Sequence, residues 1–213
     1  KKDIIEKEPI KLLLKLFLFG ILSTGVALFL EIYAEKIFPF SLQSNIIGIL
    51  FRSFIIISFC EELVKWLFTY VICWKDKNFN YVYDAIVYCV FISLGFASIE
   101  NLIAILSNSG GFALALQRGL ITVPAHAFFG IISGYYLGLA KKYEARRWYK
   151  RKRKYIILSL LIPIIVHGMF DSLLFLSSTA SLLFATALIV YLYLSSALKV
   201  VKTSSEAKKI TRR

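Results

Sequence analysis

The sequence has few cysteines, the residues whose disulfide bonds cross-link many small domains. It contains three cysteines, Cys60, Cys73 and Cys89, each in or beside an apolar run. Their odd number and their spacing argue against a disulfide framework and against a cysteine-rich metal site. They fit buried packing residues instead. The chain also shows no HExxH motif, no internal repeat and no low-complexity linker. These absences favour one continuous domain without the commonest zinc-protease signature.

Acidic residues are scarce as well, with 13 Asp and Glu against 26 Lys and Arg and a net charge of +13. The basic residues crowd into short breaks between long apolar runs. Such a distribution is typical of the positive-inside rule and of attraction to anionic lipid headgroups. We therefore expect membrane lipids, and no nucleic acid, as partners of the basic segments.

Long apolar runs dominate what remains. The chain is 58% hydrophobic, and its mean hydropathy is +0.71. Each run is long enough to cross about 30 Å of hydrocarbon as a helix. We predict an all-α, polytopic transmembrane bundle in the cell membrane, with residues 1–213 forming a single membrane-embedded domain. The six predicted spans are approximately 12–34, 45–73, 84–106, 112–140, 155–177 and 180–201.

The orientation of these spans follows from the charges of the connecting segments. Residues 141–154 form the most basic stretch and residues 202–213 form a basic tail. Because basic loops stay on the cytoplasmic side, we expect both segments, both termini and the connection 74–83 to be cytoplasmic. The predicted outer connections, 35–44 and 107–111, carry a single lysine.

Several ionisable residues lie inside predicted spans. Placing a charged side chain at the centre of a membrane helix costs about 2.5–3.5 kcal/mol on insertion scales. Four different spans carry them at a similar middle-to-outer depth. A shared polar site explains this better than isolated packing pairs. The residues are Glu61, Glu62, Lys65, Glu100, His126, His167 and Asp171. Arg52 and Arg118 lie near outer span ends, so we expect them to extend to the interface without a role in the site.

Helical spacing relates several of these residues. Lys65 follows Glu61 by four residues and Glu62 by three, so it reaches either carboxylate. Asp171 follows His167 by four residues and shares its face. Glu61 and Glu62 point about 100° apart, so one can face a cavity while the other contacts Lys65 or a neighbouring helix.

At these positions the sequence resembles the PrsW family of intramembrane proteases, distant relatives of the CAAX prenyl endopeptidases. The family pattern is EExxK, FxxxE, an intramembrane His and HxxxD. Here it reads Glu61–Lys65, Phe96–Glu100, His126 and His167–Asp171. Family members carry a further hydrophobic helix before the segment that matches residues 1–9. The resemblance therefore implies a full protein with at least seven spans.

The resemblance implies the first, site-1 cut in a single-span, membrane-anchored anti-sigma factor, which activates a sigma factor under envelope or antimicrobial-peptide stress. It also implies roles in hydrolysis by activated water. Glu61 or Glu62 would be the general base, with Glu61 favoured and Lys65 supporting the pair. Glu100 and His126 would position the water or the substrate, and His167 and Asp171 would stabilise the oxyanion or relay protons.

Three alternatives stay open at this stage. The protease would work without a cofactor or with a metal such as zinc, held by His126, His167, Glu61 and Glu100. Intramembrane ionisable residues also build proton- or cation-coupled transporters. A third reading is a non-catalytic scaffold that binds a partner helix through the stripe formed by Gly130, Gly134 and Gly138.

Overall fold

The computed structural model of the chain describes residues 6–108, 110–205 and 210, and the regular elements in these residues are all helices. In chain order they are α1 (Ile10–Ile37), the 3₁₀-helix η1 (Pro39–Leu42), α2 (Ile46–Phe51), the π-helix η2 (Arg52–Ser58), α3 (Phe59–Cys73), α4 (Val82–Ser107), α5 (Gly111–Ala145), α6 (Tyr149–Leu176) and α7 (Thr179–Ser205).

The predicted all-α, multi-pass architecture is confirmed. Among the described residues, α1, α4, α5, α6 and α7 are each long and apolar enough to cross a membrane. The remaining predicted span, 45–73, is an unbroken helical segment made of α2, η2 and α3. Helices α5 and α6 continue into the basic segment 141–154, so that only residues 146–148 connect them.

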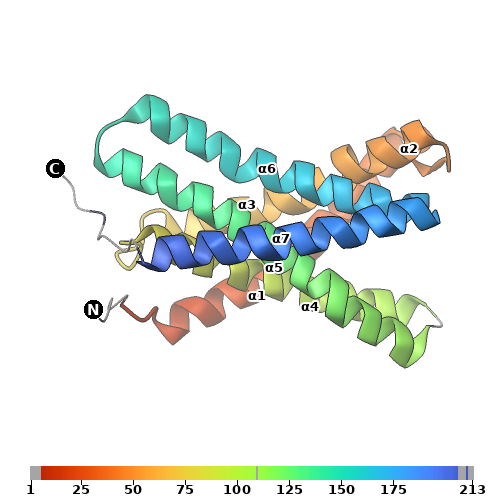
Figure 1. The fold of residues 1–213 in the computed structure, drawn as a ribbon, viewed down its shortest axis with the longest axis horizontal. Helices are drawn as coiled ribbons and strands as arrows, with labels where there is room; N and C mark the ends of the chain where they lie inside the picture. Colours follow the sequence, from red (N-terminus) through yellow and green to blue (C-terminus); the bar gives the residue numbers. More distant parts are fainter. Residues whose placement is uncertain (1–5, 109, 206–209, 211–213) are drawn as a thin grey trace.

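The helices divide the bundle into two ends (Figure 1). The start of α1, the end of α7, residues 74–81 and the α5–α6 connection lie at one end, which we call the terminal end. The α1–α2, α4–α5 and α6–α7 connections lie at the opposite, far end. Towards the far end, the α4–α5 pair diverges from α6, α7 and α2. At the far end, the α4–α5 pair is therefore separated from the other helices that reach that end.

Glycines allow the closest helix contacts in the terminal half. A Cβ atom at Gly134 of α5 would collide with the carbonyl oxygen of Ala85 in α4, and one at Gly138 would collide with that of Val82. Small residues at four-residue spacing let two helix backbones approach in this way. Gly20 of α1 and Gly95 of α4 make a second close crossing. Helix α4 is thus packed directly between α1 and α5.

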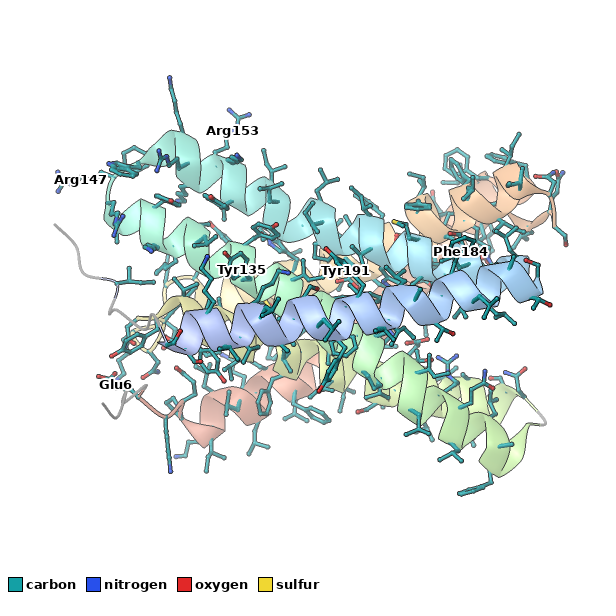
Figure 2. The ribbon with its side chains drawn as sticks, in the orientation of Figure 1. Glu6, Tyr135, Arg147, Arg153, Phe184 and Tyr191 are labelled. Atoms are coloured by element: carbon teal, nitrogen blue, oxygen red, sulfur yellow. The ribbon has the colours of Figure 1, made fainter. Side chains whose placement is uncertain are left out.

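The outer surface of the helices is apolar along its length and charged at its terminal end. Phe184 and Tyr191 of α7 project outward and are 68% and 64% exposed. Arg147 and Arg153 project at the α5–α6 turn (Figure 2). An apolar belt with charges at one end matches a bilayer and its headgroups.

A hydrogen-bonded group holds the segment before α1 against α4. The Tyr88 hydroxyl donates to Glu8 Oε2 at 2.6 Å. Asp84 Oδ2 accepts the backbone N–H groups of Asn80 and Tyr81 at 2.8 and 2.7 Å, which caps the start of α4. Burial, with Asp84 beside it, raises the pKa of Glu8 to about 7. The N-terminal segment is therefore fixed to α4 through a carboxyl group that favours its neutral form.

Candidate active site

The pair Glu61–Glu62 lies in the first turn of α3, directly after the π-helix η2. π-Helical turns are rare and are frequent at functional sites, where they displace a helix face relative to the preceding turns. Both glutamates are buried, with 5% and 4% of their surface exposed. Two carboxylates are thus held in the interior of the bundle, and their charges need partners there.

Lys65 supplies the first of these partners from the next turn of α3. Its Nζ lies 2.6 Å from Glu62 Oε1 and 3.3 Å from Glu61 Oε2. The same ammonium lies 4.3 Å from the centre of the Phe96 ring, a favourable cation–π contact. The ion pairs expected from the spacing of Lys65 with Glu61 and Glu62 are therefore present. Lys65 neutralises part of the charge of the glutamate pair.

His167 on α6 is the second partner. Its Nδ1 lies 3.0 Å from Glu62 Oε1, and its Nε2 lies 3.2 Å from Asp171 Oδ2 and 3.9 Å from Glu61 Oε2. The ring stacks on Phe129 of α5 with a centroid separation of 4.6 Å. His167 is therefore fixed in orientation by carboxylates at its edges and by an aromatic ring on one face.

His126 on α5 extends the network to α4. Its Nε2 lies 2.7 Å from Glu100 Oε2, and its Nδ1 lies 3.3 Å from Lys65 Nζ. Arg118, two turns earlier on α5, donates from Nη2 to Glu100 Oε1 at 2.6 Å and from Nε to Asn101 Oδ1 at 2.6 Å. Glu100 is thus held between a histidine and an arginine of the same neighbouring helix.

A cavity of about 240 Å³ opens onto this network. Its walls come from α1, η2, α3, α4, α5 and α6. The polar side chains that line it are Thr24, Glu31, Glu61, Glu100, Arg118, Thr122, His126, His167 and Asp171. Glu62 and Lys65 do not line it. All seven ionisable residues expected in the site belong to one network, but Glu61 faces the cavity while Glu62 contacts Lys65 and His167 behind it.

Four polar residues of the cavity wall were missed from the sequence. We expected Arg118 to reach the interface without a role in the site. That expectation is wrong, because Arg118 turns inward to Glu100. Glu31 of α1 was not singled out, although an acidic residue inside the predicted span 12–34 carries the same signal as Glu100. Thr24 and Thr122 gave no signal, because a threonine hydroxyl is readily satisfied by its own helix.

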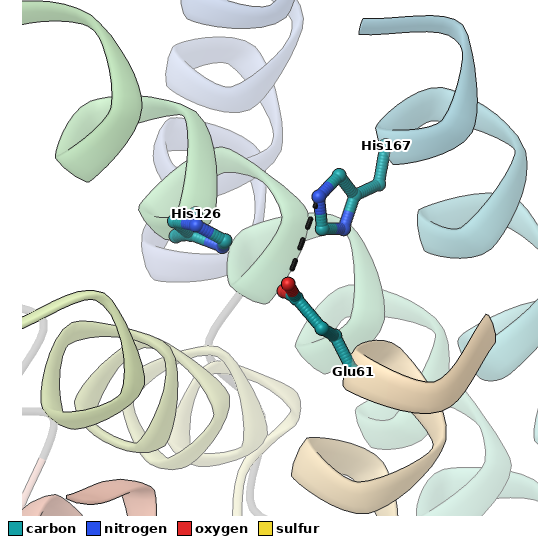
Figure 3. Close-up of side chains that lie close together, drawn as sticks. All are labelled: Glu61, His126 and His167. Atoms are coloured by element: carbon teal, nitrogen blue, oxygen red, sulfur yellow. Dashed lines mark ion pairs between the residues drawn. The ribbon is translucent and has the colours of Figure 1, made fainter. Parts of the chain in front are cut away.

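The donor atoms at the centre of the site suit a metal ion. A carboxylate oxygen of Glu61 and one ring nitrogen each of His126 and His167 lie within 4.8 Å of one another, and Figure 3 shows the three side chains converging from three helices. Two histidines and one glutamate are a known catalytic donor set for zinc. Each ring also contacts a carboxylate outside the set, Glu100 or Glu62, as metal-binding histidines do. The residues therefore fit a metal.

Comparison with known proteins gives a consistent answer. The family described as "PrsW family intramembrane metalloprotease" matches residues 8–198. Protease PrsW of Clostridioides difficile is 33% identical over 211 residues, which cover 98% of this chain and 86% of that protein. The Geobacillus kaustophilus Protease PrsW is 34% identical over 81% of this chain and 71% of its own length. The Halalkalibacterium halodurans Protease PrsW is 42% identical over 61% of this chain and 57% of its own length.

No solved structure matches the chain. The family match covers the helices that build the cavity, and the relatives span most of the chain. A buried network of glutamates and histidines on a multi-pass helical scaffold supplies general acid–base groups suited to peptide hydrolysis within a membrane. The chain therefore belongs to the PrsW family of intramembrane metalloproteases, and it is a protease.

Proposed function

We propose that this protease makes the first, site-1 cut in a single-span anti-sigma factor and so starts the release of a sigma factor under envelope or antimicrobial-peptide stress. The observation that carries the proposal is the position of the cavity. Its lining extends from Glu61 towards the far end through Leu174 and Phe175. The basic residues gather at the opposite end, which we assign to the cytoplasm. The cut would therefore fall in the extracytoplasmic half of the substrate.

In the proposed reaction, Glu61 is the general base. Its two polar contacts within the described chain, to Lys65 and His167, both use Oε2, and we assign proton transfer to Oε1. The carboxylate takes a proton from water as the water oxygen attacks the scissile carbonyl carbon. It then delivers that proton to the leaving nitrogen when the C–N bond breaks. The products are a carboxyl and an amine terminus.

Glu62 and Lys65 act as positioning residues in this scheme. Glu62 holds His167 Nδ1, and Lys65 holds both glutamates. The His167 ring is held beside Glu61 by Glu62 at Nδ1 and by Asp171 at Nε2, and in the absence of a metal we assign to the His167–Asp171 pair the relay of protons to and from Glu61. Glu100 and Arg118 keep the His126 ring in place on the opposite wall.

Glu61, His126 and His167 are the residues that would hold a metal ion, for which we propose zinc. When bound, the ion supplies Lewis-acid polarisation of the scissile carbonyl and lowers the pKa of water. A carboxylate has two oxygens, so Glu61 can offer one to the ion and keep the other for a proton. Metal analysis of the purified protein tests this directly. We expect about one zinc per chain, and far less when both histidines are replaced by alanine.

The substrate assignment is tested by co-expression with candidate single-span anti-sigma factors. We expect wild-type protein to release a shortened fragment, and Glu61→Gln to leave the substrate intact. Mass spectrometry of the fragment locates the cut. A cut in the half of the substrate span on the cytoplasmic side would contradict the site-1 assignment while leaving the protease activity in place.

A further inference from the structure

Glu31 differs from the other acidic residues of the cavity wall. Glu61 is paired with Lys65, Glu100 with Arg118 and His126, and Asp171 with His167. Glu31 lines the same cavity from α1. Within the described residues no hydrogen bond or ion pair joins its carboxylate to another group. It is therefore the acidic wall residue without an ion pair or hydrogen bond among the described residues.

The contrast is sharpest with Glu35, one turn further along the same helix. Glu35 Oε1 accepts from Arg52 Nε of η2 at 2.9 Å. Both acids come from the last third of α1, yet Glu35 forms an ion pair with Arg52, and Glu31 forms none among the described residues. An intramembrane carboxylate is costly and is normally paired or functional. The carboxylate of Glu31 can therefore accept a hydrogen bond from a group supplied from outside the chain.

The charge of the cavity indicates the sign of that partner. Its walls carry four carboxylates, those of Glu31, Glu61, Glu100 and Asp171, and a single guanidinium from Arg118. A metal at the catalytic centre would not serve Glu31, because the donor group contains Glu61, His126 and His167 without it. A positively charged group entering near α1 would gain a charge-assisted hydrogen bond in a site screened little by solvent.

Position along the helix determines which part of a substrate reaches Glu31. It lies six residues before the end of α1 at Ile37, or about 9 Å from the far end along the helix axis. A substrate helix that enters the cavity from the far end reaches the level of Glu31 before it reaches Glu61. The side chain that meets Glu31 therefore belongs to the substrate segment on the far-end side of the scissile bond.

We propose that Glu31 forms a specificity subsite that binds a lysine or arginine side chain of the substrate on the far-end side of the bond to be cut. This inference rests on the proposed protease function and adds the chemistry by which the substrate is chosen. A basic residue near the extracytoplasmic end of a single-span protein would be drawn from the headgroup region into the cavity, where Glu31 meets it.

The test measures binding separately from cleavage. The probe is a fluorescent single-span peptide of leucine and alanine, placed with the full-length protein in phosphatidylcholine vesicles. One lysine, glutamine or glutamate is moved stepwise through its extracytoplasmic third. All binding is measured in the Glu61→Gln background, with Glu31 intact or changed to Gln or Lys. Glu35→Gln is the matched control, since that acid already has Arg52.

We expect one probe position at which lysine binds about tenfold tighter than glutamine, as a single charge-assisted hydrogen bond predicts. Glu31→Gln should abolish this preference, Glu31→Lys should shift it to glutamate, and Glu35→Gln should leave it unchanged. A lysine preference that survives Glu31→Gln, or no preference at any position, overturns the proposal. Matching thermal melts of the Glu31→Gln and parent proteins show that the fold is intact.

Cleavage is scored in parallel with Glu61 present. If the wild-type protein binds the lysine probe through Glu31 but cleaves neither a probe nor any co-expressed anti-sigma factor, the proposed function is contradicted while the subsite stands. If it cleaves lysine and glutamine probes with equal kcat/KM, the subsite is contradicted while the protease stands. In the expected result, Glu31→Gln raises KM for the lysine probe about tenfold and leaves kcat nearly unchanged.

Discussion

Helices α4 and α5 meet in two different ways along their length. In the terminal half, Gly134 and Gly138 bring the backbone of α5 against Ala85 and Val82 of α4 with no room for a Cβ atom. In the far half, the same two helices are joined by charge, through Glu100 with His126 and Arg118. One half is packed as tightly as backbones allow, and the other half borders a cavity.

The difference shows how a membrane protease supports a polar site. Lipid supplies no hydrophobic driving force between helices, so close packing at small residues holds the bundle together. That packing fixes the direction of the α4–α5 pair, and the divergence of this pair from α6, α7 and α2 leaves space for charged side chains. We therefore expect changes in the charged half to remove chemistry and changes in the glycine half to remove the fold.

The largest expected effect is in the charged half. Replacing Glu61 with glutamine keeps its shape but removes the base, so the single-turnover cleavage rate should fall by about 100- to 10,000-fold. The melting temperature should fall little or not at all, because Lys65 keeps its ion pair with Glu62. Glu35→Gln, which changes an acid outside the cavity, is the control. Cleavage by Glu61→Gln at more than a tenth of the wild-type rate would contradict the assigned base.

The second effect breaks the glycine half. Gly134→Val places side-chain atoms where the carbonyl oxygen of Ala85 lies, and overpacking of this kind costs about 1–3 kcal/mol. We expect a lower melting temperature and a parallel loss of cleavage. Gly119→Ala on the same helix is the matched control, since nothing lies within 4 Å of its added Cβ. A stable Gly134→Val protein with normal cleavage would show that the close contact at Gly134 is not needed for the fold.

The third effect separates the two contacts of Glu100. Arg118→Met removes one partner and leaves His126 in place. We expect kcat/KM to fall about tenfold, as for the loss of one charged hydrogen bond. Arg52→Met, which breaks an arginine–glutamate pair outside the cavity lining, should change cleavage much less. Equal effects of the two variants would show that Arg118 acts only through stability.

The smallest effect lies at the terminal end, beyond the glycine contacts. Burial near Asp84 and Asp76 raises the pKa of Glu8 from 4.5 to about 7. The folded form therefore favours neutral Glu8, and its stabilisation is complete below pH 4.5 and is lost as the pH rises through about 7. Melting in detergent should shift down by a few degrees or less between pH 5.5 and 8.

Glu8→Gln should reduce this pH dependence, because the amide stays neutral and still accepts from Tyr88. Glu144→Gln, at the same end of the bundle, should leave the dependence unchanged. A slope that is equal in the wild-type and Glu8→Gln proteins would assign the titration to another group.

The spans and most of the site follow from local properties of the sequence. An apolar run of sufficient length forms a helix in lipid, because every backbone group must be satisfied within the segment. An ionisable residue inside such a run is costly wherever the helix lies, so Glu61, Glu100 and His167 stand out before any packing is known. The i+3 and i+4 pairs of Lys65 follow from helix geometry in the same way.

Other features depend on how the helices pack, and local sequence patterns do not predict them. Arg118 is a basic residue near the end of a predicted span, as interfacial residues are. Its contact with Glu100 depends on the packing of α4 against α5. The span 45–73 reads as one regular helix, whereas η2 makes a π-helical segment within it. A π-helix changes the register of a face by adding a residue to the turn, and the sequence carries no periodic signal for it.

The sequence by itself determined that this protein is a helical membrane bundle and which side chains were too costly to bury without a purpose. Both conclusions rest on the transfer of a segment or a charge from water to lipid, which depends on the residue and its neighbours in the chain. The tertiary structure alone decided that Glu61 faces the cavity while Glu62 contacts Lys65 and His167, and that Glu31 faces the cavity with no ion pair in the part of the chain that the structure describes. Those outcomes depend on the rotation and crossing of helices, which are set by contacts between residues far apart in the sequence.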